Sequence, residues 1–289
     1  MVRNASPVQD CHGQPEPAAE GVRTHDRALD DASAAPGGDR VRIDAAVTVP
    51  SGKSTGLSFQ VAGSLEEVID AWRLVYHAYR RIDIIPANPF EVHTVRQAAR
   101  GSSAVVLGLL GPQVISTLTC MLDGQQGLPL DLVYRKELEA LRQRGRRLCE
   151  IGLFADRREH LARSLVSLFG LMRIGIYYAV ATGCDDIVIG VHPHHAPFYR
   201  RALAFELIGE LDTHPTVCDA PVVLLRMDLA KLLLPNKPRG LAFVTESPVP
   251  ASLYADRFTF DPRLVTGSAV DQYLRAKAQP ISPILSEQS

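Results

Sequence analysis

The chain has 289 residues, with 31 Lys and Arg against 32 Asp and Glu, and 46% of its residues are hydrophobic. This composition is typical of a soluble globular protein, and the near-neutral charge argues against a general nucleic-acid binder. No apolar run reaches the about 18 residues of a membrane span, and residues 1–7 lack the apolar core of a secretory signal, so we expect a cytoplasmic protein. The five cysteines form no CxxC pair, which argues against a disulfide scaffold or a zinc–thiolate site.

The first 40 residues differ in composition from the rest of the chain. They contain four Pro, four Gly, seven acidic and four basic residues, a net charge of −3, which leaves +2 for the remainder. Large aliphatic residues are few, so burial of this segment cannot offset the entropy lost on ordering it. We therefore predict a disordered tail over residues 1–45.

The first predicted elements are a strand over 57–62 and a helix that begins at the capping box Ser64-x-x-Glu67. The apolar face of this helix continues to Tyr79. The following elements are, in order, a loop at Pro86 and Pro89, a short helix near 91–99, and an antiparallel hairpin of strands at 104–110 and 114–122.

The second half of the chain alternates helices and strands. Asp131 is the predicted N-cap of a charged helix, and Pro197 marks the first turn of a short one. The predicted elements are a helix at 132–143, a strand at 148–155, a long helix at 159–181, a strand at 186–191, the short helix from 197, and strands at 205–211 and 222–227. The order indicates an α/β (α+β) fold with a mixed central sheet, antiparallel at its start and flanked by helices, followed by a C-terminal extension.

Three stretches of this sequence resemble a known family. Residues 192–205 (HPHHAPFYRRALAF) are similar to the ending of the GNAT acyltransferase superfamily, where a strand precedes a short helix of pattern FYxxLGF. Residues 75–89 (VYHAYRRIDIIPANP) and 127–150 (GLPLDLVYRKELEALRQRGRRLCE) resemble the FeeM-type N-acyl amino acid synthases, relatives of the acyl-homoserine-lactone synthases. The resemblance covers about residues 57–275. It implies a GNAT-like acyl-CoA N-acyltransferase core at 57–229 and an extension at 230–280 packed on that core.

The resemblance implies an enzyme that moves a long-chain fatty acyl group from acyl carrier protein to the amine of an amino acid or a similar small amine. The donor would be the acyl-phosphopantetheine of the carrier, or acyl-CoA, with no tightly bound cofactor. Two alternatives remain open: a lactone synthase that uses S-adenosylmethionine, and a non-catalytic relative that binds acyl carrier protein or lipid.

Two residues are the leading catalytic candidates. Glu150 is a lone carboxylate in an apolar strand, where burial raises a pKa toward neutrality and suits a general base; the alternative is an ion pair with Arg146 or Arg147. The resemblance also places Glu150 at the acidic position of the lactone synthases. Tyr199 follows the strand that ends at 191, and the resemblance implies that it protonates the leaving sulfur; the alternative is a core aromatic residue. A strand amide at Gly152 or Leu153 would bind the oxyanion.

A histidine cluster precedes Tyr199. His192, His194 and His195 are too poor in carboxylate or cysteine neighbours to predict a metal site, so we expect no metal. His195 is a weaker catalytic candidate because the family motif also carries His there. In place of a metal site, we expect this cluster to position the donor arm or to cap the next helix.

Two features of the sequence bear on the donor site: a loop without glycine and a stretch rich in Lys and Arg. The loop at 156–162 (DRREHLA) has no glycine, so its backbone is ill suited to a diphosphate, and Arg157 or Arg158 could pair with one phosphodiester. Residues 135–163 hold nine Lys and Arg against five acids, and Arg146 and Arg147 belong to this candidate docking surface for an acidic carrier protein. A solvated helix face explains the same charges.

The acceptor side rests on the resemblance, in which the region around 80–90 forms one wall of the pocket. The candidates there are Arg80, Arg81 and Asn88, because a free carboxylate favours an arginine partner.

Overall fold

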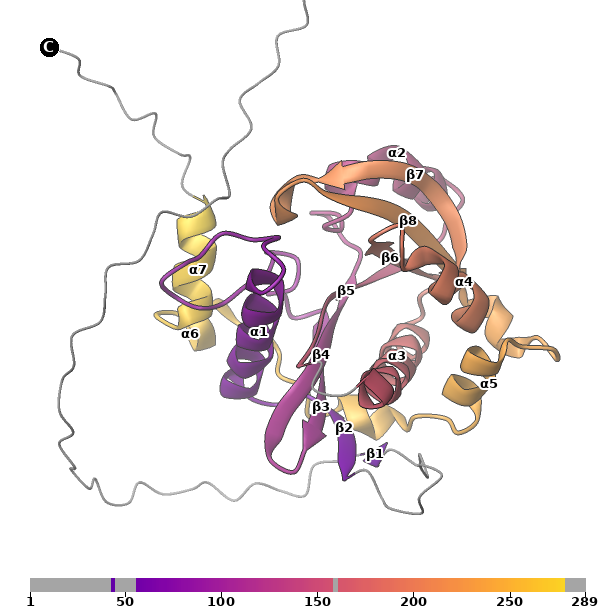
Figure 1. Ribbon diagram of the computed structural model, residues 1–289, viewed down its shortest axis with the longest axis horizontal. Helices are drawn as coiled ribbons and strands as arrows, with labels where there is room; N and C mark the ends of the chain where they lie inside the picture. The colour runs from indigo at the N-terminus through magenta and orange to yellow at the C-terminus, as the bar shows by residue number, and fades with distance from the viewer. Residues whose placement is uncertain (1–42, 45–55, 158–160, 279–289) are drawn as a thin grey trace, which may run out of the picture. The chain divides into compact units, whose positions relative to one another are not determined.

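The fold is built on one mixed sheet, seen in the computed structural model, which describes residues 43–44, 56–157 and 161–278. The described residues belong to the compact unit Val41–Ser289. The eight strands lie in the order β1-β2-β3-β4-β5-β6-β8-β7 (Figure 1). Their bounds are Ile43–Asp44 (β1), Leu57–Val61 (β2), Ser103–Leu110 (β3), Gln113–Leu122 (β4), Leu148–Asp156 (β5), Asp186–Val191 (β6), Glu206–His214 (β7) and Ala220–Asp228 (β8).

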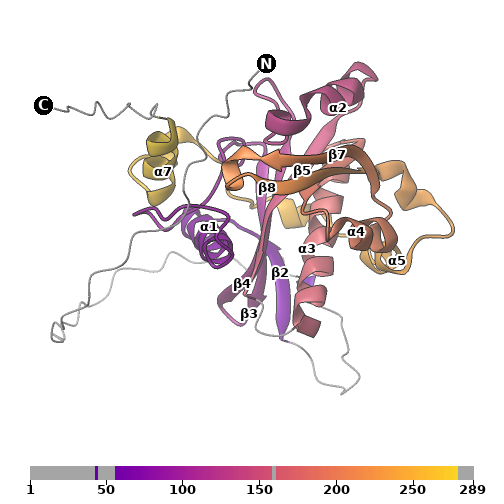
Figure 2. The same cartoon turned by 45° about the horizontal axis from the view of Figure 1, so that its top comes forward.

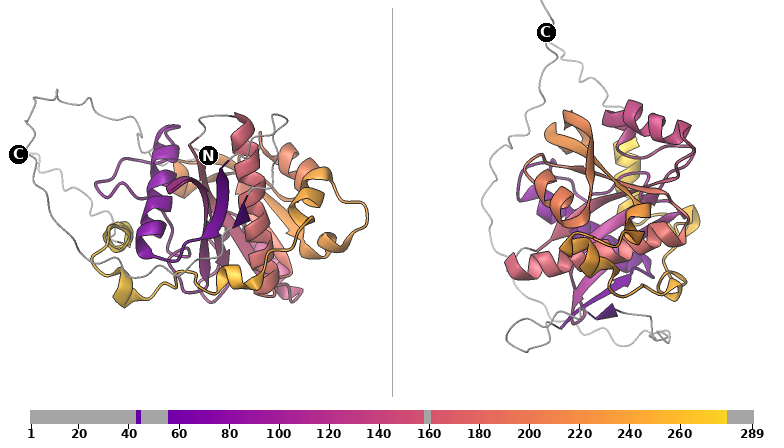
Figure 3. Two further views of the ribbon diagram at one scale, coloured as in Figure 1. Left: turned by 90° about the horizontal axis from the view of Figure 1, so that it is seen from below. Right: turned by 90° about the vertical axis from the view of Figure 1, so that its right-hand side faces the viewer.

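Helices cover both faces of the sheet, with α1 on one side and α3 on the other (Figure 3). Because both faces are covered, the whole of β3 from Ser103 to Leu109 is buried. The helices are α1 (Leu65–Arg80), α2 (Asp131–Gln143), α3 (Leu161–Ala181), α4 (Ala196–Leu203), α5 (Arg239–Thr245), α6 (Pro262–Val265) and α7 (Ala269–Ala278). In the stretches that the structure describes, none of them has the length and apolarity needed to cross a bilayer.

The start of α1 follows the predicted capping pattern. The Ser64 hydroxyl accepts a hydrogen bond from the Glu67 amide at 3.2 Å, which satisfies one of the unpaired donors of the first turn. The Glu67 carboxylate accepts from the amide of Gly63 at 2.7 Å. This fixed start orients the helix so that Trp72 and Val75 are fully buried against the sheet.

The centre of the sheet opens where β5 and β6 meet. These two strands form the parallel pair among the described strands, and they pair only from Leu148 to Glu150 against Asp186 to Val188. Beyond these residues each strand continues without the other. A shift of register between β4 and β5 and a positive φ of 51° at Leu153 mark a bulge in the same stretch. The early separation of β5 from β6 therefore creates a gap in the middle of the fold.

Most predicted elements are confirmed, including the hairpin β3–β4 and the strand β6, but two local predictions were wrong. Residues 91–99 form isolated turns and no helix, because the amide of His93 donates to the Trp72 carbonyl of α1 at 3.1 Å and not to a carbonyl of its own segment. The N-cap of α2 is Leu130 and not Asp131. The Asp131 carboxylate instead accepts a hydrogen bond from the Leu128 amide at 2.6 Å and pairs with Arg142.

Between residues 230 and 278 the structure shows three α-helices, α5, α6 and α7, that the sequence pattern did not predict. Helix α5 contacts α3 and α4 (Figure 2). Helix α7 supplies Tyr273, whose hydroxyl lies 3.1 Å from Nδ1 of His93. The short turn at Ala251–Tyr254 contacts β2. The tail predicted over 1–45 lies outside the described residues, apart from Ile43 and Asp44, which form β1.

Candidate active site

A pocket of about 540 Å³ occupies the gap between β5 and β6. Its floor is formed by β5 from Glu150 to Phe154, and its far wall by Gly190, Val191 and His192. Helix α1 and the following loop contribute Tyr79 and His93, and α4 contributes Tyr199. The parting of the two strands thus brings together side chains from distant parts of the sequence.

Glu150 lies at the point where the strands separate. Its side chain is buried, and its Oε2 accepts a hydrogen bond from the Leu130 amide at 3.0 Å. Burial raises the pKa of this carboxyl to about 8, the Leu130 hydrogen bond opposes that rise, and the charges of Asp131 and Asp123 add to it. A group with this pKa exchanges protons near neutral pH, which is the property required of a general base.

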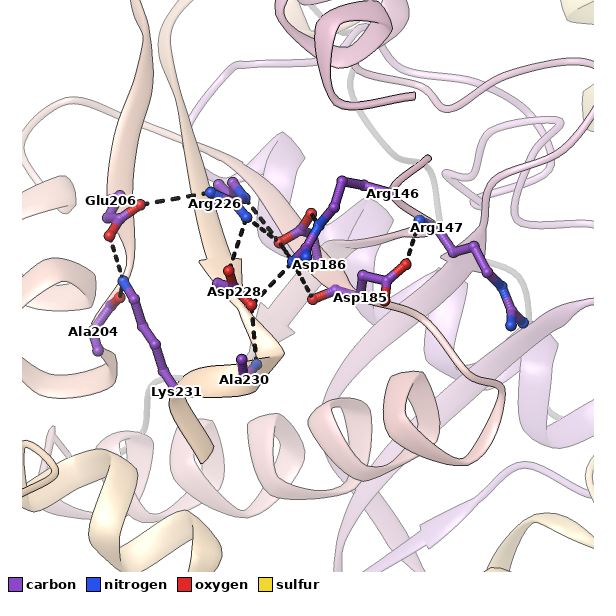
Figure 4. A network of polar contacts seen from close by, with 10 residues as sticks. All are labelled: Arg146, Arg147, Asp185, Asp186, Ala204, Glu206, Arg226, Asp228, Ala230 and Lys231. Atoms are coloured by element: carbon purple, nitrogen blue, oxygen red, sulfur yellow. Dashed lines mark hydrogen bonds and ion pairs between the residues drawn. The ribbon is translucent and has the colours of Figure 1, made fainter. Parts of the chain in front are cut away.

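Neither arginine that could have neutralised Glu150 does so. Arg146 turns away to Asp186, with Nε 2.6 Å from Oδ2, and to Asp228 (Figure 4). The amide of Arg147 donates to the Asp185 carboxylate at 2.8 Å, and its guanidinium donates to the Thr182 carbonyl. The ion-pair interpretation of Glu150 is therefore wrong, and its carboxylate keeps one oxygen for the pocket.

Gly152 follows two residues later on the same face of β5. A β carbon there would lie 3.6 Å from Oε1 of Glu150 and 3.2 Å from the Met121 methyl group. The missing side chain therefore leaves room next to the carboxylate. Leu153, the next residue, adopts the left-handed conformation that marks the bulge.

Tyr199 borders the same pocket from α4. Burial raises the pKa of its hydroxyl to about 12, so the phenol holds its proton at neutral pH. Its ring packs against Phe198 and Phe205, with centroid distances of 5.5 and 6.0 Å. The structure thus brings together Glu150, Gly152, Leu153 and Tyr199 around one cavity.

The three histidines also reach this pocket, at its edge. The His194 amide donates to Nδ1 of His192 at 3.2 Å, and the rings of His194 and His195 lie 5.6 Å apart. His195 is the N-cap residue of α4 but makes no capping hydrogen bond with its side chain. Throughout the described ranges, no three His, Cys, Asp or Glu residues gather as a metal site.

The predicted acceptor residues do not line the pocket. Arg80 donates to the Ile85 carbonyl at 2.9 Å and lies 3.6 Å from Asp83, which closes the turn after α1. Asn88 bridges its own loop through the Val92 carbonyl and the Phe90 amide. Arg81 is exposed and borders a separate groove that also includes Arg157. The sequence could not place these side chains because the loop turns back on itself after Arg81.

The predicted donor residues are divided between regions. Arg146 and Arg147 lie before β5, next to the C-terminal end of α3, and contact no part of the pocket. Arg157 follows β5 and is exposed, and Arg158 lies outside the described residues.

Three titratable pocket residues were not among the predicted site residues: Tyr79, His93 and His214. Burial lowers the pKa of His93 to about 3, with smaller effects from Lys277 and His214, so its ring is neutral. Burial likewise raises the pKa of Tyr79 to about 12. The sequence pattern predicts Tyr79 only as a part of the apolar face of α1. The signal available for His93 was its place, with Thr94, between the apolar residues Val92 and Val95.

Comparisons with known proteins give the family. Residues 70–228, more than half of the chain, match the sequence profile of the family described as N-acyl amino acid synthase FeeM. The chain belongs to this family. The solved structure of FeeM, an N-acyl amino acid synthase from uncultured soil microbes, is 26% identical with a TM-score of 0.53, over 61% of this chain and 92% of that one. The predicted family and the α/β acyltransferase fold are confirmed.

Other solved structures are more distant. TofI, solved in a ternary complex with an inhibitor and MTA, is 16% identical with a TM-score of 0.48, over 68% of this chain and 98% of that one. BjaI, a CoA-dependent acyl-homoserine lactone synthase, is 10% identical with a TM-score of 0.46 over the same shares. No curated protein matches. Family membership identifies the protein as an acyltransferase, and the pocket at the β5–β6 gap is its candidate active site.

Proposed function

We propose that this acyltransferase moves a long-chain fatty acyl group from acyl carrier protein to the amine of an amino acid or a similar small molecule. The observation that carries the proposal is Glu150, a buried carboxylate with a pKa of about 8 that shares one pocket with the protonated Tyr199. A base on the pocket floor and an acid from α4 match the two proton transfers of aminolysis.

The proposed reaction begins with the acceptor bound as its ammonium form, whose reference pKa is about 7.7–8.0 for an α-amino group. Ionised Glu150 takes one proton, either directly or through a water molecule. The neutral nitrogen then attacks the thioester carbonyl, and an amide of the Gly152–Leu153 segment donates a hydrogen bond to the oxyanion. The C–S bond breaks, and Tyr199 gives its proton to the departing thiolate. The new amide nitrogen passes its remaining extra proton to the Tyr199 phenolate, which restores the phenol, and Glu150 releases the first proton to solvent.

The acceptor wall, in this proposal, is uncharged. Within the part of the chain that the structure describes, no Lys or Arg lines the pocket. Neutral His93 and Tyr79 face it from the α1 side, with Ile82 and Ile84 beside them. We propose that the polar group of the acceptor binds to these neutral donors, since a buried charge without a counter-ion costs several kcal/mol.

The donor in this proposal is an acyl thioester on a phosphopantetheine arm. The loop at 156–162 lacks the glycines that would let backbone amides approach a diphosphate, which favours the carrier protein over CoA. Arg157 and Arg158 remain candidates for pairing with the single phosphodiester of that arm.

Product analysis tests this function. Lipid extracts from cells that express the wild type, Glu150→Gln and the exposed control Glu66→Gln are compared by mass spectrometry. We expect N-acyl amines with the wild type and the control, and a loss of about 10²–10⁴-fold with Glu150→Gln.

Two results would contradict the proposal. Acyl-homoserine lactone without acyl amine would identify a lactone synthase. Purified protein that binds acyl carrier protein but releases no carrier thiol with a mixture of amines would identify a non-catalytic binder.

A further inference from the structure

A second hollow lies on the other side of α4 from the candidate active site. This groove, of about 670 Å³, runs between α3, α4 and α5, which lie side by side in Figures 1 and 2. We call it the α3–α5 groove. It is lined by Leu165, Val166, Phe169, Phe198, Arg201, Ala202, Arg239, Gly240 and Phe243.

The lining of this groove is apolar although it is open. Leu165 is 45% exposed and Phe243 is 37% exposed, whereas most large aliphatic and aromatic side chains of the described core are covered. The Phe169 ring contacts Phe198 and Phe243 at centroid distances of 6.0 Å each, so the three rings form a continuous floor. Grouped apolar side chains at a surface mark a site for a partner.

The rim of the groove is positively charged. Arg200, Arg201 and Arg239 are exposed, and no ion pair joins them to an acid within the described residues. The sequence contains no Asp or Glu from 187 to 205 or from 229 to 245. The acid nearest to Arg201 along the chain, Glu206, already pairs with Lys231 at 2.6 Å. Such a rim attracts acidic side chains and rejects basic ones.

Helix α4 connects the groove with the pocket. Phe198, Arg201 and Ala202 follow the i, i+3, i+4 spacing of one helix face and line the groove, while Tyr199 lies on the pocket side. The ring centroids of Phe198 and Tyr199 are 5.5 Å apart. A partner held in the groove is therefore separated by a single short helix from the proposed thiolate acid.

Three arginines of the 135–163 cluster, Arg142, Arg146 and Arg147, are already engaged elsewhere in the fold. Arg142 lies 2.6 Å from Asp123 and 2.7 Å from Asp131, and Arg146 is paired with Asp186. Arg147 contacts Thr182 at the C-terminal end of α3, whereas the groove begins near Leu165. At 1.5 Å per residue these two positions are about 25 Å apart along the helix.

We propose that the α3–α5 groove is the docking surface for the acyl carrier protein, which places an acidic amphipathic helix across it. Apolar side chains of that helix enter the phenylalanine floor, and its carboxylates pair with Arg201 and Arg239. This inference rests on the proposed function for the identity of the partner.

The test is a titration of the purified full-length chain with fluorescently labelled holo-acyl carrier protein. We expect Arg201→Glu/Arg239→Glu to weaken the Kd at least tenfold, and added salt to weaken binding by the wild type. Arg135→Glu/Arg144→Glu, the same charge change in the 135–163 cluster, serves as the matched control and should bind as the wild type does. Thermal unfolding of each variant verifies that it is folded.

Turnover separates docking from chemistry. With acyl-pantetheine, a donor without the protein, the groove variant should keep the wild-type rate, whereas its KM for acyl carrier protein rises. Wild type that binds the carrier but transfers no acyl group would defeat the proposed function and leave the docking surface standing. Three results would overturn the docking surface: weakening by the control pair alone, equal binding by all variants, or a change of oligomeric state in place of a change in carrier Kd.

Discussion

Glu150 combines two features that rarely coexist in one carboxylate. It is buried among apolar residues, yet it keeps a hydrogen bond from the Leu130 amide and an oxygen beside the space left by Gly152. Its protonation state is therefore set by burial, and this gives a pH dependence to both the rate and the stability of the protein.

The rate should rise with pH. Because the ionised form of Glu150 is the proposed base and its pKa is about 8, kcat/KM increases tenfold per pH unit below that value and levels off above it, after allowance for ionisation of the amine. The measurement is a pH–rate profile of the purified enzyme, repeated with an acceptor of lower amine pKa. The assignment would be contradicted if the rising part of the profile shifted with the amine pKa but stayed in place in Glu150→Asp.

Stability should change in the opposite direction. The folded pKa of about 8 exceeds the value of 4.5 expected for an unfolded glutamate, so between these values the folded state alone holds the proton. The free energy of unfolding therefore falls as pH rises through this window, by up to about 1.4 kcal/mol per unit, and is constant above it. Urea unfolding at several pH values gives the free energy of unfolding of the wild type and of Glu150→Gln, and the difference between the two isolates this slope. Glu66→Gln, an exposed change in α1, should leave the slope intact.

At the level of elements, the closed end of the β5–β6 gap is held by an ion-pair network (Figure 4). Asp186 at the start of β6 is fully buried and accepts from both Arg146, which precedes β5, and Arg226 of β8. Asp228 completes the network through the same two arginines. The three strands are thus fixed at one end, while the other end of the gap stays open.

Asp186→Asn should therefore destabilise the fold by on the order of 3 kcal/mol, since it leaves two arginines without their buried counter-charge. Chemical denaturation gives this value. Asp271→Asn, which removes the exposed pair with Arg275, is the comparison and should cost clearly less. Equal costs for the two variants would show that the network does not fix the strands.

Helix α7 affects the pocket through one hydrogen bond, between the Tyr273 hydroxyl and Nδ1 of His93. Tyr273→Phe should lower stability by about 1 kcal/mol and raise the KM for the acceptor several-fold, because the His93 ring is no longer held at the acceptor wall. Tyr254→Phe, which loses an equivalent bond to the Ile174 carbonyl, should match the stability loss and keep the wild-type KM. A KM unchanged in both variants would remove His93 from the acceptor wall.

At the scale of the whole molecule, charge and chemistry are unevenly distributed. The whole chain has a net charge of −1, and residues 1–40 have a net charge of −3. A chain that begins at residue 41 therefore has a net charge of +2. We predict that deletion of residues 1–40 leaves the thermal midpoint and kcat unchanged, since that segment has too few apolar residues to contribute to a core. Calorimetry and steady-state kinetics of the shortened chain are the measurements. A lower midpoint would show that the segment packs on the fold.

The sequence predicted the elements that depend on residues close together in the chain. Periodicity and capping predicted α1, β6 and α4, and burial of Glu150 followed from a lone acid in an apolar strand. It failed where the partner of a side chain comes from far along the chain. Arg146 pairs with Asp186, 40 residues away, and the His93 ring contacts the Tyr273 hydroxyl, 180 residues later.

The gap between β5 and β6 has a consequence for how this protein can vary. Its oxyanion-binding amides, in the proposed mechanism, belong to the main chain, and every amino acid except proline supplies the same donor. Side chains at Ile151 and Phe154 can therefore change the shape of the cavity without removing that donor. Alanine substitution of these two residues would leave the donor untouched and report only on fit. Substrate preference can thus diverge between relatives while the main-chain part of the chemistry stays the same.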